Sequence, residues 1–156
     1  MQAAARKARV MVCYCATVFR PGYPEIGQRN KTFSQRKASG QTAITDPMAL
    51  IHPSVRPIEG EVVVGKHRVN ALYGTGLDVA LRANDIHDLV IFGYATSGVI
   101  LSTARYGADL DYNLIVVEDC CADSDVEVHD FLTQRIFPRQ AELVGSDEVI
   151  RALEAI

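Results

Sequence analysis

The chain has 156 residues with a net charge of −3, and 48% of its residues are hydrophobic. This length and composition suit a single domain, residues 1–156, with a sizeable core. No apolar run approaches the roughly 18–20 residues that a membrane span needs. The absence of a basic stripe argues against nucleic acid as a partner. The first residues lack the apolar segment of a secretory signal, so we expect a cytoplasmic protein with no membrane association.

The N-terminal part predicts a helix, a strand and a long connection. Residues 2–8 look like the last turns of a helix, with basic residues at the end that suit the helix dipole. Residues 10–18 are rich in β-branched and aromatic side chains and predict a strand that is apolar on both faces. Residues 19–60 are polar and interrupted by prolines, which predicts a long irregular loop. An α/β chain that opens inside a helix suggests that a preceding strand is missing.

Two glycine-containing segments in the middle of the chain only partly match phosphate-binding motifs. Residues 61–66 predict a strand, and residues 60–66 fit part of a Walker A pattern, but His67 stands where that motif requires Ser or Thr. Residues 74–76 are Gly-Thr-Gly, with no strand before them and no third glycine, so a dinucleotide site is not indicated. Residues 76–84 predict a short helix.

The stretch from residue 88 to residue 123 predicts a strand–helix–strand unit. Residues 89–92 form a short apolar run, as expected of a strand covered on both faces. Gly93 ends that run, residues 96–98 offer a cap, and a helix follows from Val99. Residues 113–117 predict a second buried strand. Ligands in such sheets bind beyond the carboxyl ends of the strands, which here means residues 94–99 and the turn after Val117.

The C-terminal part continues the alternation of helix and strand. Ser124 and Glu127 have the spacing of a capping box, and the helix they open ends at Pro138. Residues 141–144 predict a last strand, and Ser146 opens a final helix. The whole pattern predicts an α/β fold with a mostly parallel sheet.

The central stretch resembles the isochorismatase-like cysteine hydrolase superfamily. The matching residues are Gly93, Thr96, Ser97, Gly98, Ser102, Thr103, Arg105, Ala108, Asp109, Tyr112, Val117, Glu118 and Asp119. Lys66-His67-Arg68 resembles the lysine motif of that superfamily, and residues 20–25 and 29–33 resemble one branch in which the loop, here residues 19–60, covers the pocket. The resemblance extends from about residue 3 to residue 144. It implies a Rossmann-like three-layer sandwich, a homo-oligomer and a non-proline cis peptide near Tyr94–Ala95.

The resemblance also implies a catalytic group of three residues. The lysine corresponds to Lys66, and the cysteine nucleophile at the start of the helix corresponds to Val99, which cannot attack a carbonyl. The aspartate at the end of the first strand has no counterpart, since no Asp occurs before Asp46. Backbone N–H groups around Tyr94, Ala95, Thr96, Ser97 and Gly98 would form the oxyanion pocket. Isochorismatases proper also lack the cysteine, and they use the aspartate as a general acid.

These observations leave three hypotheses for function. The favoured one is a family hydrolase acting on a small amide or vinyl ether, catalytically impaired because Val99 replaces the nucleophile and the aspartate is absent. The alternative is a non-catalytic module that binds a small anion at the helix N-terminus beside Lys66. A weaker third is an enzyme that uses Cys120 or Cys121. We expect no cofactor, and no metal site, since the histidines show no ligand spacing. Without the resemblance, Lys66 would be read as a solvated charge.

The expected missing strand is a structural problem for the fold. In the resembled superfamily this strand lies in the middle of the sheet, so its loss would leave one open edge on each neighbour. Each buried unpaired backbone group costs roughly 1–3 kcal/mol. The neighbouring strands could pair directly, a partner could supply the strand, or the chain could be an incomplete version of a longer protein. We favour the last.

Overall fold

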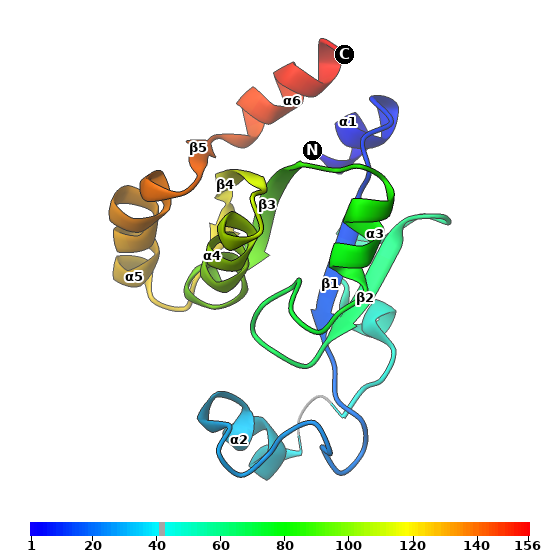
Figure 1. Ribbon diagram of the computed structural model, residues 1–156, viewed down its shortest axis with the longest axis vertical. Coiled ribbons are helices and arrows are strands. Elements are labelled where there is room, and N and C mark those ends of the chain that lie inside the picture. Colours follow the sequence, from blue (N-terminus) through cyan, green and yellow to red (C-terminus); the bar gives the residue numbers. More distant parts are fainter. Residues whose placement is uncertain (41–42) are drawn as a thin grey trace.

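The computed structural model describes residues 1–40 and 43–156, and it has the α/β architecture that the sequence predicts. Helices and strands alternate along most of the chain (Figure 1). The helices are α1 (Gln2–Lys7), α2 (Lys31–Ser39), α3 (Leu77–Ala83), α4 (Leu101–Asp109), α5 (Val126–Phe131) and α6 (Ser146–Glu154). The strands are β1 (Cys13–Thr17), β2 (Val62–Lys66), β3 (Asp88–Tyr94), β4 (Asn113–Ala122) and β5 (Glu142–Val144).

The strands form two separate parallel sheets. The first sheet pairs β1 with β2, and the second has the order β3-β4-β5. Within the described part of the chain, β1 and β3 do not pair with each other. They point the same way and lie on facing sides of the gap between the sheets (Figure 1). The two strands therefore do not pair directly, and the prediction that they would, one of the three expected solutions, is wrong.

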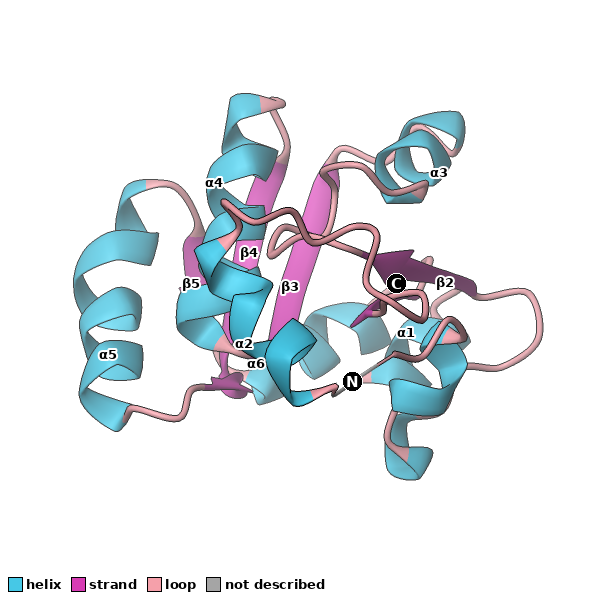
Figure 2. Cartoon of the chain, turned by 90° about the horizontal axis from the view of Figure 1, so that it is seen from below, coloured by secondary structure: helices cyan, strands magenta, loops and turns pink. Residues whose placement is uncertain are grey.

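Helices cover both faces of the strands and hold the two sheets together. Seen from below, α3 and α4 lie on one side of the strands, while α1 and α6 lie on the other (Figure 2). One apolar core runs across both sheets: it includes Leu81 and Ile100 from the helices, and Cys13 and Ile91 of β1 and β3 pack against it. The sheets are thus joined through side chains, in the three-layer arrangement that the resemblance implied.

Residues 41 and 42 of the predicted loop at residues 19–60 lie outside the described residues, and the rest of the loop is more ordered than expected. It contains α2 and two short 3-10 helices, Pro47–Leu50 and Pro53–Val55. The Asn30 side chain caps α2 by accepting a hydrogen bond from the Phe33 N–H at 3.2 Å. Phe33 packs with Phe19 and two other apolar residues in a small second core. The prediction of a wholly irregular loop failed because a single buried aromatic, within a polar sequence, anchors α2.

Several element boundaries differ from the predicted ones. β1 is shorter than residues 10–18, and β4 continues through Ala122 instead of ending at Val117. A bulge makes this extension: Ile91 pairs with Val116, but Gly93 pairs with Cys121. The cap of α5 is Asp125, whose carboxylate accepts from the Glu127 and Val128 N–H groups, and not the predicted Ser124. None of the described helices is both long and apolar enough to cross a membrane.

Candidate functional site

Lys66 ends β2 with its ammonium group held inside the protein. The residue is only 5% exposed, so the interpretation as a solvated charge is wrong. Its Nζ atom donates to the carbonyl oxygens of Arg68 at 2.9 Å and Val69 at 3.0 Å. Burial lowers the pKa of Lys66 because the charged form loses its hydration, whereas the nearby Cys15 opposes that shift. The segment that follows β2 therefore holds the Lys66 ammonium group in place.

That segment is locked onto α4 by two polar contacts. The Asn70 side chain donates to the Ser102 carbonyl at 2.7 Å, and Thr103 Oγ1 accepts from the Ala71 N–H at 3.0 Å. Thr103 is buried, and a buried hydrogen bond of this kind is costly to leave unmade. Lys66 is therefore fixed relative to the helix whose first turns carry Val99. The sequence placed Thr103 in the family pattern, but gave no signal for Asn70.

The turn after β3 has the unusual backbone that the resemblance implied. The peptide bond between Tyr94 and Ala95 is cis, which confirms that prediction. A π-helical turn, Thr96–Ile100, follows and runs directly into α4, so the helix begins earlier than the predicted start at Val99. A Cβ atom on Gly98 would lie 3.9 Å from Val69 Cγ1, so this turn lies against the segment that accepts from Lys66. The structure thus brings the lysine and the turn together.

The cap of this turn comes from a residue that the sequence analysis missed. The Ser97 N–H donates to Asp123 Oδ2 at 2.7 Å. Hydrogen bonds from the Ser97 side chain and from this N–H hold the pKa of Asp123 low, at about 2. Thr96 is fully buried, and its Oγ1 lies 2.8 Å from His129 Nδ1. No side chain within residues 96–98 caps the turn, contrary to the prediction. Asp123 follows the bulge in β4, so only the folded register brings it to Ser97.

Two of the backbone donors predicted for an oxyanion, the N–H groups of Ser97 and Gly98, already have acceptors. Besides the Ser97 N–H, the N–H groups of Gly98 and Ile100 donate to the Ala95 carbonyl at 3.1 and 3.3 Å. A small anion at this helix N-terminus would have to displace the Asp123 carboxylate. The side chain of Val99, at the nucleophile position, is half-buried and packs against the main core.

The cysteines do not have the properties of activated nucleophiles. Burial raises the pKa of Cys121 to about 11, and burial with the neighbouring Asp119 raises that of Cys120. The pKa of Cys15, beside Lys66, is also raised to about 11 by burial. A reactive cysteine needs the opposite shift, toward the thiolate at neutral pH. The geometry gives no support to Cys120 or Cys121 as a replacement for the missing nucleophile.

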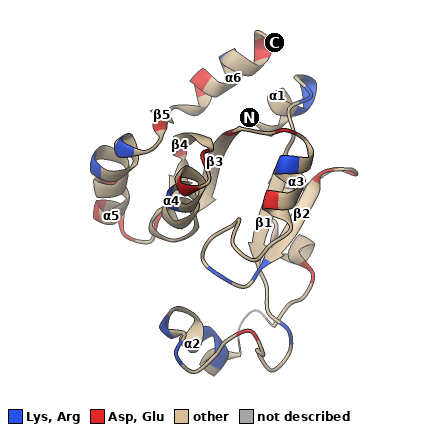
Figure 3. Cartoon of the chain, viewed as in Figure 1, with Lys and Arg blue, Asp and Glu red and all other residues tan. Residues whose placement is uncertain are grey.

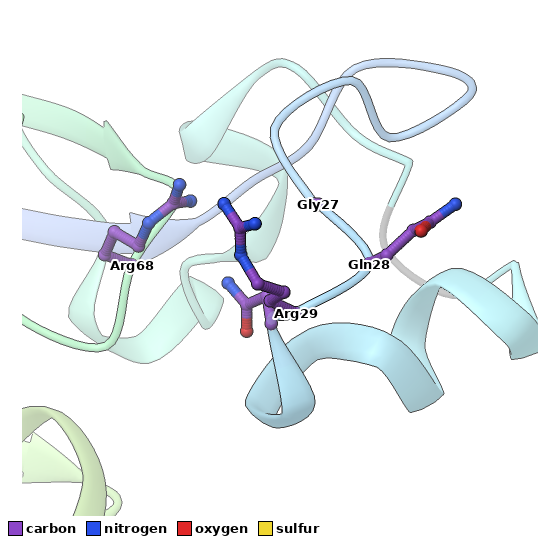
Figure 4. Close-up of a pocket in the computed structure, with 5 residues that line it drawn as sticks. Gly27, Gln28, Arg29 and Arg68 are labelled. Carbon is purple, nitrogen blue, oxygen red and sulfur yellow. The ribbon is translucent and has the colours of Figure 1, made fainter.

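A second feature of the site is a basic cavity next to the segment after β2. It measures about 520 Å³ and is lined by Gly27, Gln28, Arg29, Asn30 and Arg68. The guanidinium groups of Arg29 and Arg68 point toward the same space (Figure 4). Arg68 is held in place because its Nη1 donates to the His67 and Glu25 carbonyls at 2.6 and 3.2 Å. Further basic residues lie on α2 nearby in the chain, including Arg36 and Lys37 (Figure 3).

The described residues contain no group of three or more His, Cys, Asp or Glu side chains that could hold a metal ion.

The site belongs to a parallel α/β protein and has a buried lysine at the end of one strand. The segment that binds this lysine lies against a cis-peptide turn at the end of another strand. Residues 1–148 match the Isochorismatase domain, and the chain belongs to that family.

Curated relatives are similar over parts of their length. The chain is 32% identical over 103 residues to the uncharacterized isochorismatase family protein YecD of Escherichia coli O157:H7, covering 65% of this chain and 55% of that protein. It is 26% identical over 154 residues to N-carbamoylsarcosine amidase from an Arthrobacter species, covering 98% of this chain and 58% of that protein. A maleamate amidohydrolase from Pseudomonas putida is 28% identical over 108 residues, with 69% and 51% covered. The chain thus spans about half the length of the curated relatives it matches.

Solved structures share the fold more completely. A cysteine hydrolase from Pseudomonas syringae pv. phaseolicola superposes with a TM-score of 0.90 at 25% identity, covering 99% of this chain and 76% of that one. An isochorismatase family protein from Burkholderia thailandensis gives a TM-score of 0.82 at 28% identity, with 98% and 78% covered. The predicted isochorismatase-like fold is therefore confirmed.

Proposed function

We propose that this chain is a hydrolase-family domain whose site is built for small amides and whose catalysis is impaired. The observation that carries the proposal is the buried Lys66, fixed beside the cis-peptide turn at residues 94–98. Several relatives are named as amidases or amidohydrolases, which favours an amide over a vinyl ether as the substrate bond. We also propose that the protein is cytoplasmic and, as the resemblance implies, a homo-oligomer.

The residues present supply charge and position but not covalent catalysis. A buried ammonium group beside the turn stabilises negative charge, because the low local dielectric strengthens the interaction. Val99 carries no lone pair, so no covalent intermediate can form there. Loss of one positioned acid–base group typically lowers a rate by about 10²–10⁴-fold, and the missing nucleophile adds to that loss. Amide hydrolysis by these residues alone would have to use water directly.

An ammonia-release assay with N-carbamoylsarcosine and with maleamate tests the impairment. We expect the wild-type chain to release no more ammonia than the Lys66→Met variant does. The exposed Lys31→Met variant serves as the matched control. Turnover that disappears in Lys66→Met and persists in Lys31→Met would show that the site is active, and would refute the impairment.

The second candidate function is binding of a small anion without catalysis. The observation that favours it is the pair Arg29 and Arg68, which face one cavity with Arg68 already positioned. Two guanidinium groups can bind a carboxylate or phosphate through charge-assisted hydrogen bonds. Because the Ser97 N–H already donates to the Asp123 carboxylate, this cavity is a better place for the anion than the helix N-terminus.

Calorimetric titration with maleate and with inorganic phosphate tests this second function. Binding in the cavity would be supported if binding is saturable, is lost in Arg29→Gln and is retained in the control variant Arg36→Gln. Binding that Lys66→Met removes and Arg29→Gln leaves would place the anion beside the lysine instead. Absence of saturable binding would exclude both places for these two anions.

A further inference from the structure

Two side chains from the corner between β4 and α5 hold the turn that opens α4. The Asp123 carboxylate accepts from the Ser97 N–H at 2.7 Å, and His129 Nδ1 lies 2.8 Å from Thr96 Oγ1. These contacts reach consecutive residues of the turn, directly after the cis peptide Tyr94–Ala95. The position of the turn therefore depends on side chains that the chain supplies only after β4.

The contact with Thr96 determines the form of the His129 ring. Thr96 is fully buried, and among the described residues the imidazole is the only hydrogen-bond partner of its hydroxyl group. Because a buried hydroxyl proton needs an acceptor, the Thr96 O–H donates to Nδ1 of the ring. The imidazole is then neutral, with a lone pair on Nδ1 and its proton on Nε2.

We propose that His129 is a positioning residue of the site, and that it holds the cis-peptide turn only while its imidazole is neutral. This inference rests on the proposed function, because the turn leads to Val99 and lies against the segment that binds Lys66. A protonated imidazole carries a proton on Nδ1 as well. The Thr96 hydroxyl must then accept that proton and turn its own toward a place where no described residue offers an acceptor. Because a buried donor without a partner is costly, protonation should loosen the turn.

The charged groups around His129 favour the protonated ring. The segments that pack most closely against α5 are Thr96–Ile100, which has no titratable side chain, and Leu132–Ile136, which has only Arg135. The carboxylates near the histidine in the chain are Asp123, Asp125, Glu127 and Asp130. These carboxylates and the place of His129 in the last turn of α5 stabilise a positive charge, and the Thr96 hydroxyl opposes it.

Amide hydrogen exchange at Ser97 and Gly98, followed by NMR at pH 5 and pH 8, tests the proposal. Histidine is the side chain that ordinarily changes charge between about pH 5 and pH 8. We expect the protection factors of these two amides in the wild type to be at least tenfold lower at pH 5 than at pH 8. Asp123 does not cause this change, because its pKa of about 2 keeps it ionised over the whole range.

Three variants make the result specific to His129. His129→Asn places an amide oxygen, which does not titrate, near the position of Nδ1, and should keep the high protection at both pH values. His129→Leu offers no acceptor and should give low protection at both. His87→Leu is the matched control at a histidine whose side chain is 70% exposed, and it should behave as the wild type does.

Two results of the exchange experiment would overturn the proposal. One is wild-type protection that is the same at pH 5 and pH 8, and the other is an equal pH dependence in the wild type and in His129→Asn. Both comparisons hold even if circular dichroism shows that His129→Leu does not fold.

Alkylation of a Val99→Cys variant separates this inference from the proposed function. A low thiol pKa at position 99 that rises in His129→Leu, and is restored in His129→Asn, would support the positioning role. A low thiol pKa with protection that does not depend on His129 would overturn the positioning role and leave the hydrolase site standing. An ordinary thiol pKa with protection that depends on His129 would reject the hydrolase site and support the hold of His129 on the turn.

Discussion

The Asp123 carboxylate accepts a hydrogen bond from the Ser97 N–H at 2.7 Å, across 26 residues of sequence. It therefore caps the turn that opens α4 from a neighbouring strand, and not from within the helix. Asp123→Ala removes this cap, and we expect a loss of about 1 kcal/mol in the free energy of unfolding, the usual value for a helix cap. Urea denaturation at pH 7 measures the loss. An unchanged unfolding midpoint would show that the contact does not stabilise the fold.

The same contact predicts a pH dependence of stability. The pKa of Asp123 is lowered to about 2 in the folded protein, whereas an unfolded aspartate has a pKa of about 3.9. The stabilisation is thus fully present above about pH 4 and is lost as the pH falls toward 2. We expect the wild type and Asp123→Asn to differ in stability at pH 6 and to converge near pH 2. A difference that stays constant over this range would contradict the assignment.

Lys66 predicts a pH dependence of stability of the same sign, but in the alkaline range. Burial lowers its folded pKa below the ordinary value of about 10.4, so the folded state binds fewer protons in the alkaline range. Stability should therefore rise with pH between the folded and unfolded pKa values, relative to a variant without the lysine. We expect the difference in free energy of unfolding between the wild type and Lys66→Met to shift in favour of the wild type between pH 7 and pH 10. The difference between the wild type and the exposed Lys31→Met variant should not change. Urea denaturation at the two pH values measures it.

Phe33 is predicted to hold α2 in place. It is buried, and its ring centroid lies 5.2 Å from that of Phe19. Phe33→Ala should destabilise the small second core by about 3 kcal/mol, the lower end for buried Phe. Because this core is separate from the main one, the loss should loosen α2 more than the sheets. Amide exchange should speed up within residues 31–39 and not in β4, and Ser34→Ala is the matched control. Equal acceleration in both places would contradict this separation.

The sequence could predict what depends on local pattern. The apolar run at residues 89–92 and the one at residues 113–117 gave the central strands, because buried parallel strands need apolar residues on both faces. The resemblance supplied the cis peptide at Tyr94–Ala95 and the place of Lys66. The expectation of open strand edges also followed from it, and the structure shows β1 and β3 unpaired with each other.

The sequence could not predict what depends on contacts between distant segments. Asp123 reaches Ser97 only through the bulge that shifts β4 against β3. Ser124 and Asp125 are both good caps, and only the folded backbone decides between them. The basic cavity needs Arg29 and Arg68, which lie 39 positions apart in the sequence, to meet across the long loop.

The most direct measurement of the central claim is the thiol pKa at position 99. In the Val99→Cys variant, the rate of alkylation at residue 99 is followed against pH by peptide mass spectrometry. If Lys66 and the turn form a hydrolase site, the thiol pKa should lie below the ordinary value of about 8.5 and rise when Lys66→Met is added. A Val128→Cys variant, on the surface of α5, should titrate normally in both backgrounds. An ordinary pKa at position 99 that Lys66→Met leaves unchanged would contradict the account.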